Sequence, residues 1–358
     1  MLQGFLRRMA FGTAYRVGMY DMFEQLLANK VPLDRAIALL QEQEIRRSGR
    51  RSTRNKVFRY WRQKLDDGVN FGVAVRGILP ESEAMIIEAG AQTDRLGECF
   101  GYARQMVEGN QRILGAIVAS TAYPVALFVS SGLALYGAAI ELIPNVATVL
   151  PLDQWVGLAA IMAAISIYLR DFGTETVIGI LTVIGLIALS MPRLTAQVRI
   201  KLDRIPPWSL YRLYQGAAFL LAISALQASG VRIDGIILDR IGKGRSPWLT
   251  QRIRALRKQI ISGETKANLG EAMKSTGYGF PDPDLNDQIA VYATLPKFEE
   301  ALLRLTMRWL DTSEKTVKQN MRLVFYAALC SVAFVIILLL SSIFGIMEQV
   351  QKAASSVT

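Results

Sequence analysis

The pattern of hydrophobic and polar positions is dominated by one uncharged run near the C-terminal end. Residues Leu323 to Met347 form 25 consecutive positions without a charged side chain. At about 1.5 Å per helical residue, this run can cross a hydrocarbon core that needs ~20 residues. The preceding segment, Glu299 to Arg322, has apolar residues at helical spacing and contains neither Pro nor Gly. The sequence therefore predicts an amphipathic helix that continues directly into a membrane span.

The same arrangement occurs earlier in the chain. Asp94 to Gln111 contains no Pro and leads into Ile113 to Ile140, a run of 28 uncharged residues. Pro80-Glu81 before this helix corresponds to Pro283-Asp284 before the later one. Because the same order of features occurs twice, we predict that the chain is built from two related halves. We call residues 1–112 the first half and residues 193–322 the second half.

The distribution of charge predicts which side of the membrane each part occupies. The net charge is +11, and residues 1–112 hold 18 Lys and Arg against 13 Asp and Glu, while residues 193–322 hold 21 against 12. Residues 141–176 hold a single cation, Arg170, against four acids. Because basic residues gather on the cytoplasmic side of spans, both halves are expected in the cytoplasm. The first twelve residues lack the apolar core of a secretory signal, so we also expect a cytoplasmic N-terminus.

Two shorter apolar segments lie between the halves. Trp155 to Leu169 and Val177 to Met191 each contain 15 residues, which is short for a span. If both crossed the membrane, the basic second half would lie outside. We therefore expect Val177 to Met191 to cross, and Trp155 to Leu169 to lie at the outer interface or to pack on the first span.

These arguments predict an all-α membrane protein with three spans and two similar cytoplasmic bundles of about six helices each. The expected boundaries are a first bundle over residues 1–112, a span over 113–140, a periplasmic or interfacial segment over 141–176, a span over 177–192, a second bundle over 193–322, a span over 323–347 and a periplasmic tail over 348–358.

The composition argues against catalysis and cofactor binding. The chain contains no His, and its two Cys, Cys99 and Cys330, cannot build a structural zinc site. Pairs of carboxylates such as Asp66-Asp67 and Glu299-Glu300 could bind a hard cation, but helix ends and solvated faces account for them better. We therefore expect no enzyme activity, no cofactor and no metal site. Nucleic-acid binding is also disfavoured, because the cations lie where membrane anchoring places them.

A basic connection between helices occurs at the same place in both halves. Because Arg side chains suit carboxylates, the recurrence favours contact with an acidic partner over a merely solvated surface. The candidate partner-contact residues are Arg46, Arg47, Arg50, Arg51 and Arg54 in the first half, and Arg240, Lys243 and Arg245 in the second.

The duplicated segments resemble the type II secretion F family, the platform proteins of type IV pilus and type II secretion machines. The resemblance rests on Phe23 to Ile37 and Phe219 to Ile236, on Leu150-Pro151, and on the run that contains Arg199, Asp203 and Ile205-Pro206. The family's Gly-Glu-x-Ser-Gly-x-Leu signature appears as Gly90 to Leu96, with Ala91 in place of Glu and Asp94 in place of Gly. The divergence favours a type IVb or conjugative pilus branch and puts in doubt any cation site that the family builds with that Glu.

This resemblance implies a multi-pass protein of the bacterial inner membrane that couples a cytoplasmic ATPase to the polymerisation of pilin or pseudopilin. The implied partners are a hexameric secretion ATPase, pilin or pseudopilin, other inner-membrane assembly proteins, membrane lipid and further copies of the chain. A passive membrane scaffold or channel component without a motor is the alternative.

Overall fold

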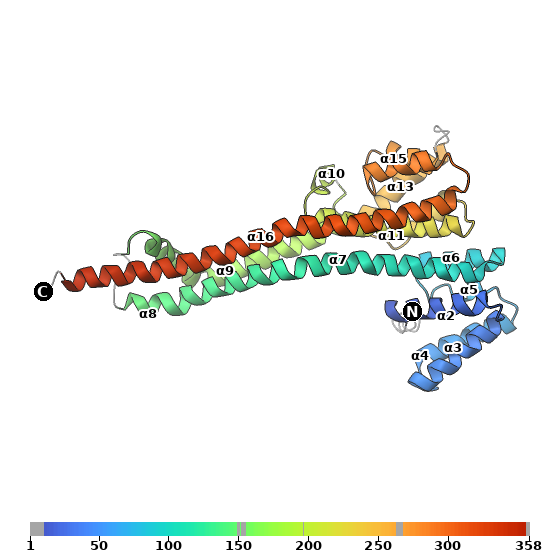
Figure 1. The fold of residues 1–358 in the computed structure, drawn as a ribbon, viewed down its shortest axis with the longest axis horizontal. Coiled ribbons are helices and arrows are strands. Elements are labelled where there is room, and N and C mark those ends of the chain that lie inside the picture. Colours follow the sequence, from blue (N-terminus) through green and yellow to red (C-terminus); the bar gives the residue numbers. More distant parts are fainter. Residues whose placement is uncertain (1–10, 149–150, 152–154, 196, 263–267, 356–358) are drawn as a thin grey trace. The chain divides into compact units, whose positions relative to one another are not determined.

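The computed structural model describes residues 11–148, 151, 155–195, 197–262 and 268–355, and these residues contain helices but no strand (Figure 1). The helices of the first half are α2 (Thr13–Ala28), α3 (Leu33–Ser48), α4 (Thr53–Asp66), α5 (Phe71–Ala74), α6 (Glu81–Thr93) and the start of α7 (Leu96–Gly137). Beyond α7 follow η1 (Ala138–Leu142), α8 (Ile143–Ala147) and α9 (Leu158–Arg193). The second half contains α10 (Val198–Leu202), α11 (Trp208–Ala228), α12 (Gly235–Gly242), α13 (Pro247–Ser262), α14 (Leu269–Ser275), α15 (Pro283–Tyr292) and the start of α16 (Phe298–Ser355).

Three helices are long and apolar enough to cross a membrane, as expected. They cover Leu96–Ala147, Leu158–Arg193 and Phe298–Gly345 in the described part of the chain. The first and third begin in the polar segments of the two halves, which confirms that a polar helix continues without interruption into a candidate span in each case.

The chain folds into two compact units. Residues 1–114 and 191–314 form one unit, and residues 115–190 and 315–358 form the other. The first unit thus contains almost all of both halves. Because the two halves belong to the same unit, this division does not confirm the expected arrangement of two bundles.

Local features nevertheless recur between the two halves. The six helices α2 to α7 are matched in order by α11 to α16. The turn after α2 places Lys30 at φ 60°, and the turn after α11 places Gly230 at φ 84°. The backbone amide of the next residue donates to the carbonyl oxygen five residues earlier in both halves, from Val31 to Leu26 at 3.0 Å and from Val231 to Leu226 at 2.9 Å. These matched turns support the interpretation of the chain as an internal repeat.

The first unit has an aromatic core in each half. In the first half, Trp61 and Phe71 pack with ring centroids 5.6 Å apart, and Phe23 stacks on Phe100 at 4.5 Å. In the second half, Trp248 packs edge-on against Phe280 at 5.5 Å. Nearly every residue from Gly216 to Ala228 of α11 is buried, and α11 contacts α6 of the first half. The contact between the halves therefore includes an apolar helix, which favours their stable association.

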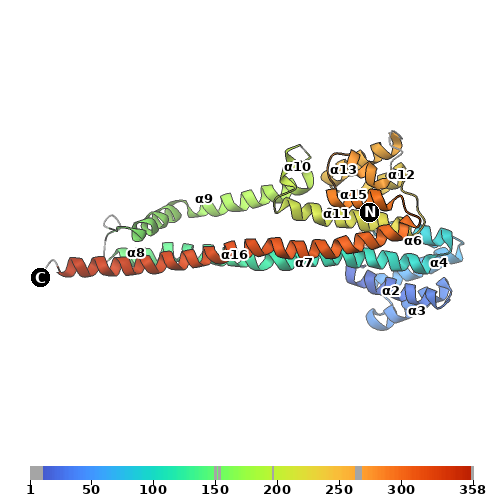
Figure 2. The same cartoon turned by 45° about the horizontal axis from the view of Figure 1, so that its top comes forward.

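In the second unit, α7 and α16 run side by side in both views (Figures 1 and 2). Tyr123 and Phe325 approach at 5.5 Å, and the Ser131 hydroxyl donates to Ser331 O at 3.5 Å.

The two middle apolar segments lie on either side of a kink in α9, as the break in the apolar pattern predicts. The range Leu158 to Arg193 consists of two helical stretches that meet at Phe172, whose backbone is non-helical at φ −126° and ψ 18°. Its first part and Trp155 form an apolar cluster with Ala139 and Ile143. This cluster also includes Leu338 of α16, so the segment packs on residues of both α16 and the end of the expected first span. The lipid depth of this segment stays a prediction.

Candidate partner-contact surface

Residues 46–54 form a short helix-to-helix connection that we call the first basic tip. Helix α3 ends at Ser48, Gly49 adopts φ 82°, and the Ser52 hydroxyl caps α4 by accepting the Asn55 amide at 3.1 Å. Arg46, Arg47, Arg50 and Arg51 are all exposed. The first two lie in the last turn of α3, where the negative end of the helix dipole favours cations. The structure therefore presents four of the five predicted arginines of this tip to solvent.

Arg54, the fifth candidate of the first basic tip, is engaged within the chain. Its guanidinium lies 4.1 Å from the ring centroid of Tyr15 and 3.8 Å from the carboxylate of Glu44. Glu44 is buried and also accepts hydrogen bonds from the hydroxyls of Tyr15 at 3.1 Å and Ser52 at 3.2 Å. Burial and the nearby Glu44 carboxylate raise the pKa of Tyr15. Arg54 thus helps to neutralise a buried acid and fixes the base of the tip.

Residues 240–246 form the second basic tip, which has the same design. Helix α12 ends at Gly242, Gly244 adopts φ 74°, and the Ser246 hydroxyl accepts the amide of Leu249 at 3.3 Å. Lys243 and Arg245 are exposed, as the candidate role requires.

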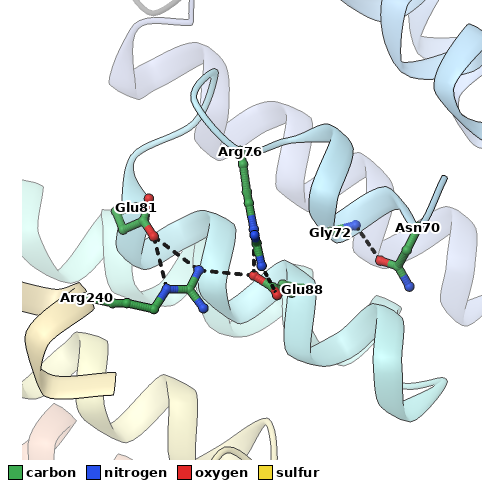
Figure 3. A network of polar contacts seen from close by, with 6 residues as sticks. All are labelled: Asn70, Gly72, Arg76, Glu81, Glu88 and Arg240. Atoms are coloured by element: carbon green, nitrogen blue, oxygen red, sulfur yellow. Dashed lines mark hydrogen bonds and ion pairs between the residues drawn. The ribbon is translucent and has the colours of Figure 1, made fainter. Parts of the chain in front are cut away.

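Arg240 instead joins the two halves through α6 (Figure 3). Its Nη2 donates to Glu81 Oε1 and Glu88 Oε2, both at 3.1 Å, and its Nε donates to Glu81 Oε1 at 3.2 Å. Arg76 donates to the same Glu88 carboxylate from α5's C-terminal side, with its Nε at 3.1 Å. Arg240 is therefore occupied by acids of its own chain. The sequence analysis missed Glu81 and Glu88, whose spacing of seven residues places them on one helix face.

The paired arginines change the titration of Glu88. Burial alone raises the pKa of this carboxyl, but hydrogen bonds from Arg76 and Arg240 outweigh burial, so the pKa lies below the ordinary value of 4.5. Since the pKa is depressed in the folded state, the resulting stabilisation is complete above about pH 4.5 and is lost as the pH falls through the folded-state value.

Arg240→Gln is expected to lower the free energy of unfolding by about 1 kcal/mol at neutral pH, because Arg240 and Glu88 are only partly exposed. The variant should also lose less stability than the wild type when the pH falls below 4.5, since the pKa of Glu88 moves back toward its ordinary value. Thermal unfolding of the detergent-solubilised chain between pH 3 and pH 7 measures both effects. Identical pH profiles for variant and wild type would contradict the assigned pairing.

A second buried ionic cluster lies where the chain leaves α9. Arg199 is fully buried, with Nη1 2.7 Å from Asp203 Oδ1, although this pair is not aligned as a hydrogen bond. Arg252 Nη2 donates to the other Asp203 oxygen at 2.8 Å, and its guanidinium lies 3.8 Å from the ring centroid of Trp248. Burial lowers the pKa of Arg252 to about 10, so this guanidinium stays charged at neutral pH. Arg199, one of the 21 cations counted in the second half, is thus a core residue.

The signature segment Gly90 to Leu96 forms the junction between α6 and α7. Asp94 has φ 56° and ψ 24°, a left-handed conformation that favours Gly and that Asp tolerates better than most residues. This backbone conformation suits the Gly that the family signature has at the position of Asp94. Among the described residues, no group of three or more Cys, Asp or Glu side chains is arranged to hold a metal ion.

A cavity of about 520 Å³ lies beside this junction, between segments of both halves. It is lined by residues that include Arg95, Tyr102, Gln227, Arg232, Lys297 and Glu300. Cations and acids both line it, so its charge does not select one class of ligand.

Comparison with known proteins identifies two similarities. Residues 219–345 match the family described as type II secretion system (T2SS), protein F. The chain is also 19% identical over 345 residues to the toxin coregulated pilus biosynthesis protein E of Vibrio cholerae, covering 95% of this chain and 98% of that protein. The family match covers most of the second half and the third candidate span, and the relative covers nearly the whole chain.

Proposed function

We propose that this chain, a protein of the type II secretion system F family, is an inner-membrane platform that couples a cytoplasmic secretion ATPase to the polymerisation of pilin or pseudopilin. The name of the Vibrio cholerae relative refers to pilus biosynthesis, which favours pilus assembly over a secretion apparatus. The proposed role is mechanical, with no chemical step carried out by the chain.

The observation that carries this proposal is the packing of both halves into one unit whose helices continue as candidate spans. Arg240 of the second half pairs with Glu81 and Glu88 of the first, which supports a location of both halves on the same side of the membrane. Two crossings between the halves fit this arrangement, and the basic residues favour the cytoplasmic side. We therefore propose a cytoplasmic N-terminus and a cytoplasmic unit that is continuous with α7 and α16.

Continuous helices suit the transmission of force. A motor that moves the cytoplasmic unit acts directly on helices that enter the bilayer, because α7 and α16 contain no turn at the junction. Pilin or pseudopilin, other inner-membrane assembly proteins and lipid then contact the spans, and further copies of the chain complete the platform.

We assign the motor contact to the first basic tip, because four of its arginines are exposed and can bind acidic side chains of a partner. Single exposed ion pairs contribute only ~0.2–1 kcal/mol, so one substitution should change little. Reversing Arg47, Arg50 and Arg51 to Glu should slow association with the ATPase by on the order of tenfold at low salt and remove its salt dependence. Filament assembly should fall accordingly at matched protein levels.

The control reverses the same amount of charge outside the tips, at the exposed residues Arg59, Arg254 and Lys258. ATPase co-purification and filament counts are compared between the two variants. Normal assembly in the tip variant would place the motor contact elsewhere and favour a passive scaffold or channel component if no other surface binds the ATPase.

A further inference from the structure

The two basic tips share a turn but differ in how far they extend. Each contains a Gly in the left-handed region and a Ser that caps the next helix, at Gly49 and Ser52 in the first tip and at Gly244 and Ser246 in the second. The helix before the turn has 16 residues in α3 but 8 in α12. Since each helical residue adds about 1.5 Å, α3 is longer by roughly 12 Å. The first basic tip is therefore built to reach farther from its own half.

The second basic tip already holds an acidic helix. Arg240, in the last turn of α12, bridges Glu81 and Glu88 of α6 through a single guanidinium (Figure 3). Seven residues correspond to about two helical turns, so the backbone positions of Glu81 and Glu88 lie on one face, roughly 10 Å apart along the helix axis. Their side chains converge, because the same Nη2 atom donates to an oxygen of each. The planar fork of Arg carries several donors, which lets it engage both acids.

The first basic tip has the same chemistry without such a helix. Arg46 stands two residues before the end of α3, as Arg240 stands two residues before the end of α12. Within the described part of the chain, the ion pairs of the tips involve Arg54 and Arg240, whereas Arg46, Arg47, Arg50 and Arg51 are exposed. This tip therefore concentrates positive charge where the second tip meets carboxylates.

We infer that the first basic tip binds an acidic helix of its partner that presents two carboxylates seven residues apart, as α6 presents Glu81 and Glu88 to Arg240. The inference rests on the proposed function only for the identity of the partner as the ATPase. The recognition chemistry itself rests on the internal contact between α12 and α6.

The test uses the full chain in nanodiscs and two fluorescent stapled helical peptides of equal composition. One peptide carries Glu at positions i and i+7, which share a face, and the other carries Glu at i and i+5, which lie about 140° apart. At low ionic strength, the first peptide should bind about threefold more tightly or better, because it offers two simultaneous ion pairs. This preference should disappear when Arg46, Arg47, Arg50 and Arg51 are replaced by Gln.

The matched control is the variant Lys243→Gln with Arg245→Gln in the second basic tip, which should keep the preference. Equal binding of the two peptides, or a preference that survives the fourfold substitution, would overturn the inference. The outcome is separable from that of the proposed function. If the peptide preference is found but the ATPase does not associate, the inference holds and the ATPase is not the partner. If the ATPase associates through the tip but no peptide preference is found, the proposed function holds and the inference fails.

Discussion

Asp203→Ala is expected to destabilise the second half by roughly 3–5 kcal/mol, because it leaves two buried arginines without a counter-charge. Arg199 and Arg252 are 0% and 3% exposed, and Asp203 is the carboxylate that both approach. Burial lowers the pKa of both arginines, yet their charged forms persist at neutral pH and must then remain buried unpaired. The loss should therefore greatly exceed that of a surface ion pair.

Thermal unfolding in nanodiscs, followed by tryptophan fluorescence, measures this effect. The control is Arg304→Gln, which removes an exposed pair with Glu300 on α16 and should cost less than about 0.5 kcal/mol. An Asp203→Ala chain as stable as the control would mean that the cluster contributes little to the second half. Replacing all three charged residues by apolar residues of similar volume should restore much of the stability, since no charge then remains buried.

Gly270→Ala is expected to cost about 3 kcal/mol, at the upper end of the usual penalty for overpacking. A Cβ at this position would lie 2.1 Å from the Ala290 amide nitrogen and 2.5 Å from its Cα, so α14 must move away from α15. These are backbone atoms, which cannot rotate aside as a side chain can. The movement would also strain the hydrogen bond that Asn268 Nδ2 donates to Ala290 O, at 2.8 Å.

Gly72 holds the equivalent place in the first half, where a Cβ would lie 2.4 Å from the Cα of Glu88. Gly72→Ala should therefore destabilise the chain to a similar degree. The matched control is Gly18→Ala in α2, where nothing lies within 4 Å of the added Cβ and the better helix former should stabilise by about 0.5–1 kcal/mol. A similar unfolding temperature for all three variants would contradict the close helix approach.

The sequence predicted the long elements well because their signal is local. Runs without charge such as Leu323 to Met347 mark spans, and the uninterrupted apolar spacing from Glu299 onward marks the helix that enters the bilayer. The break between the middle segments was also visible in the sequence, because Arg170 and Asp171 interrupt the apolar pattern directly before the kink at Phe172. The packing of Trp155 against Ala139 was not predictable in detail, because no local pattern encodes it.

The candidate surface was predictable only in part, for a related physical reason. Clustered arginines in the first basic tip are visible in the sequence, and a Gly and a Ser at the turn explain their exposure. The pairing of Arg240 with Glu81 joins residues 159 positions apart, and no local pattern encodes it. The burial of Arg199 likewise depends on Trp248 and Asp203, so a count of cations in the second half does not reveal that this one lies in the core.

The central claim is most directly tested by identifying the proteins that co-purify with the intact chain in mild detergent from the cells in which it is made. The account predicts a secretion ATPase together with prepilin or pseudopilin subunits, with the ATPase reduced by the reversal of Arg47, Arg50 and Arg51 and retained in the charge-matched control. Recovery of the chain with lipid or transported substrates alone would contradict a platform driven by a motor.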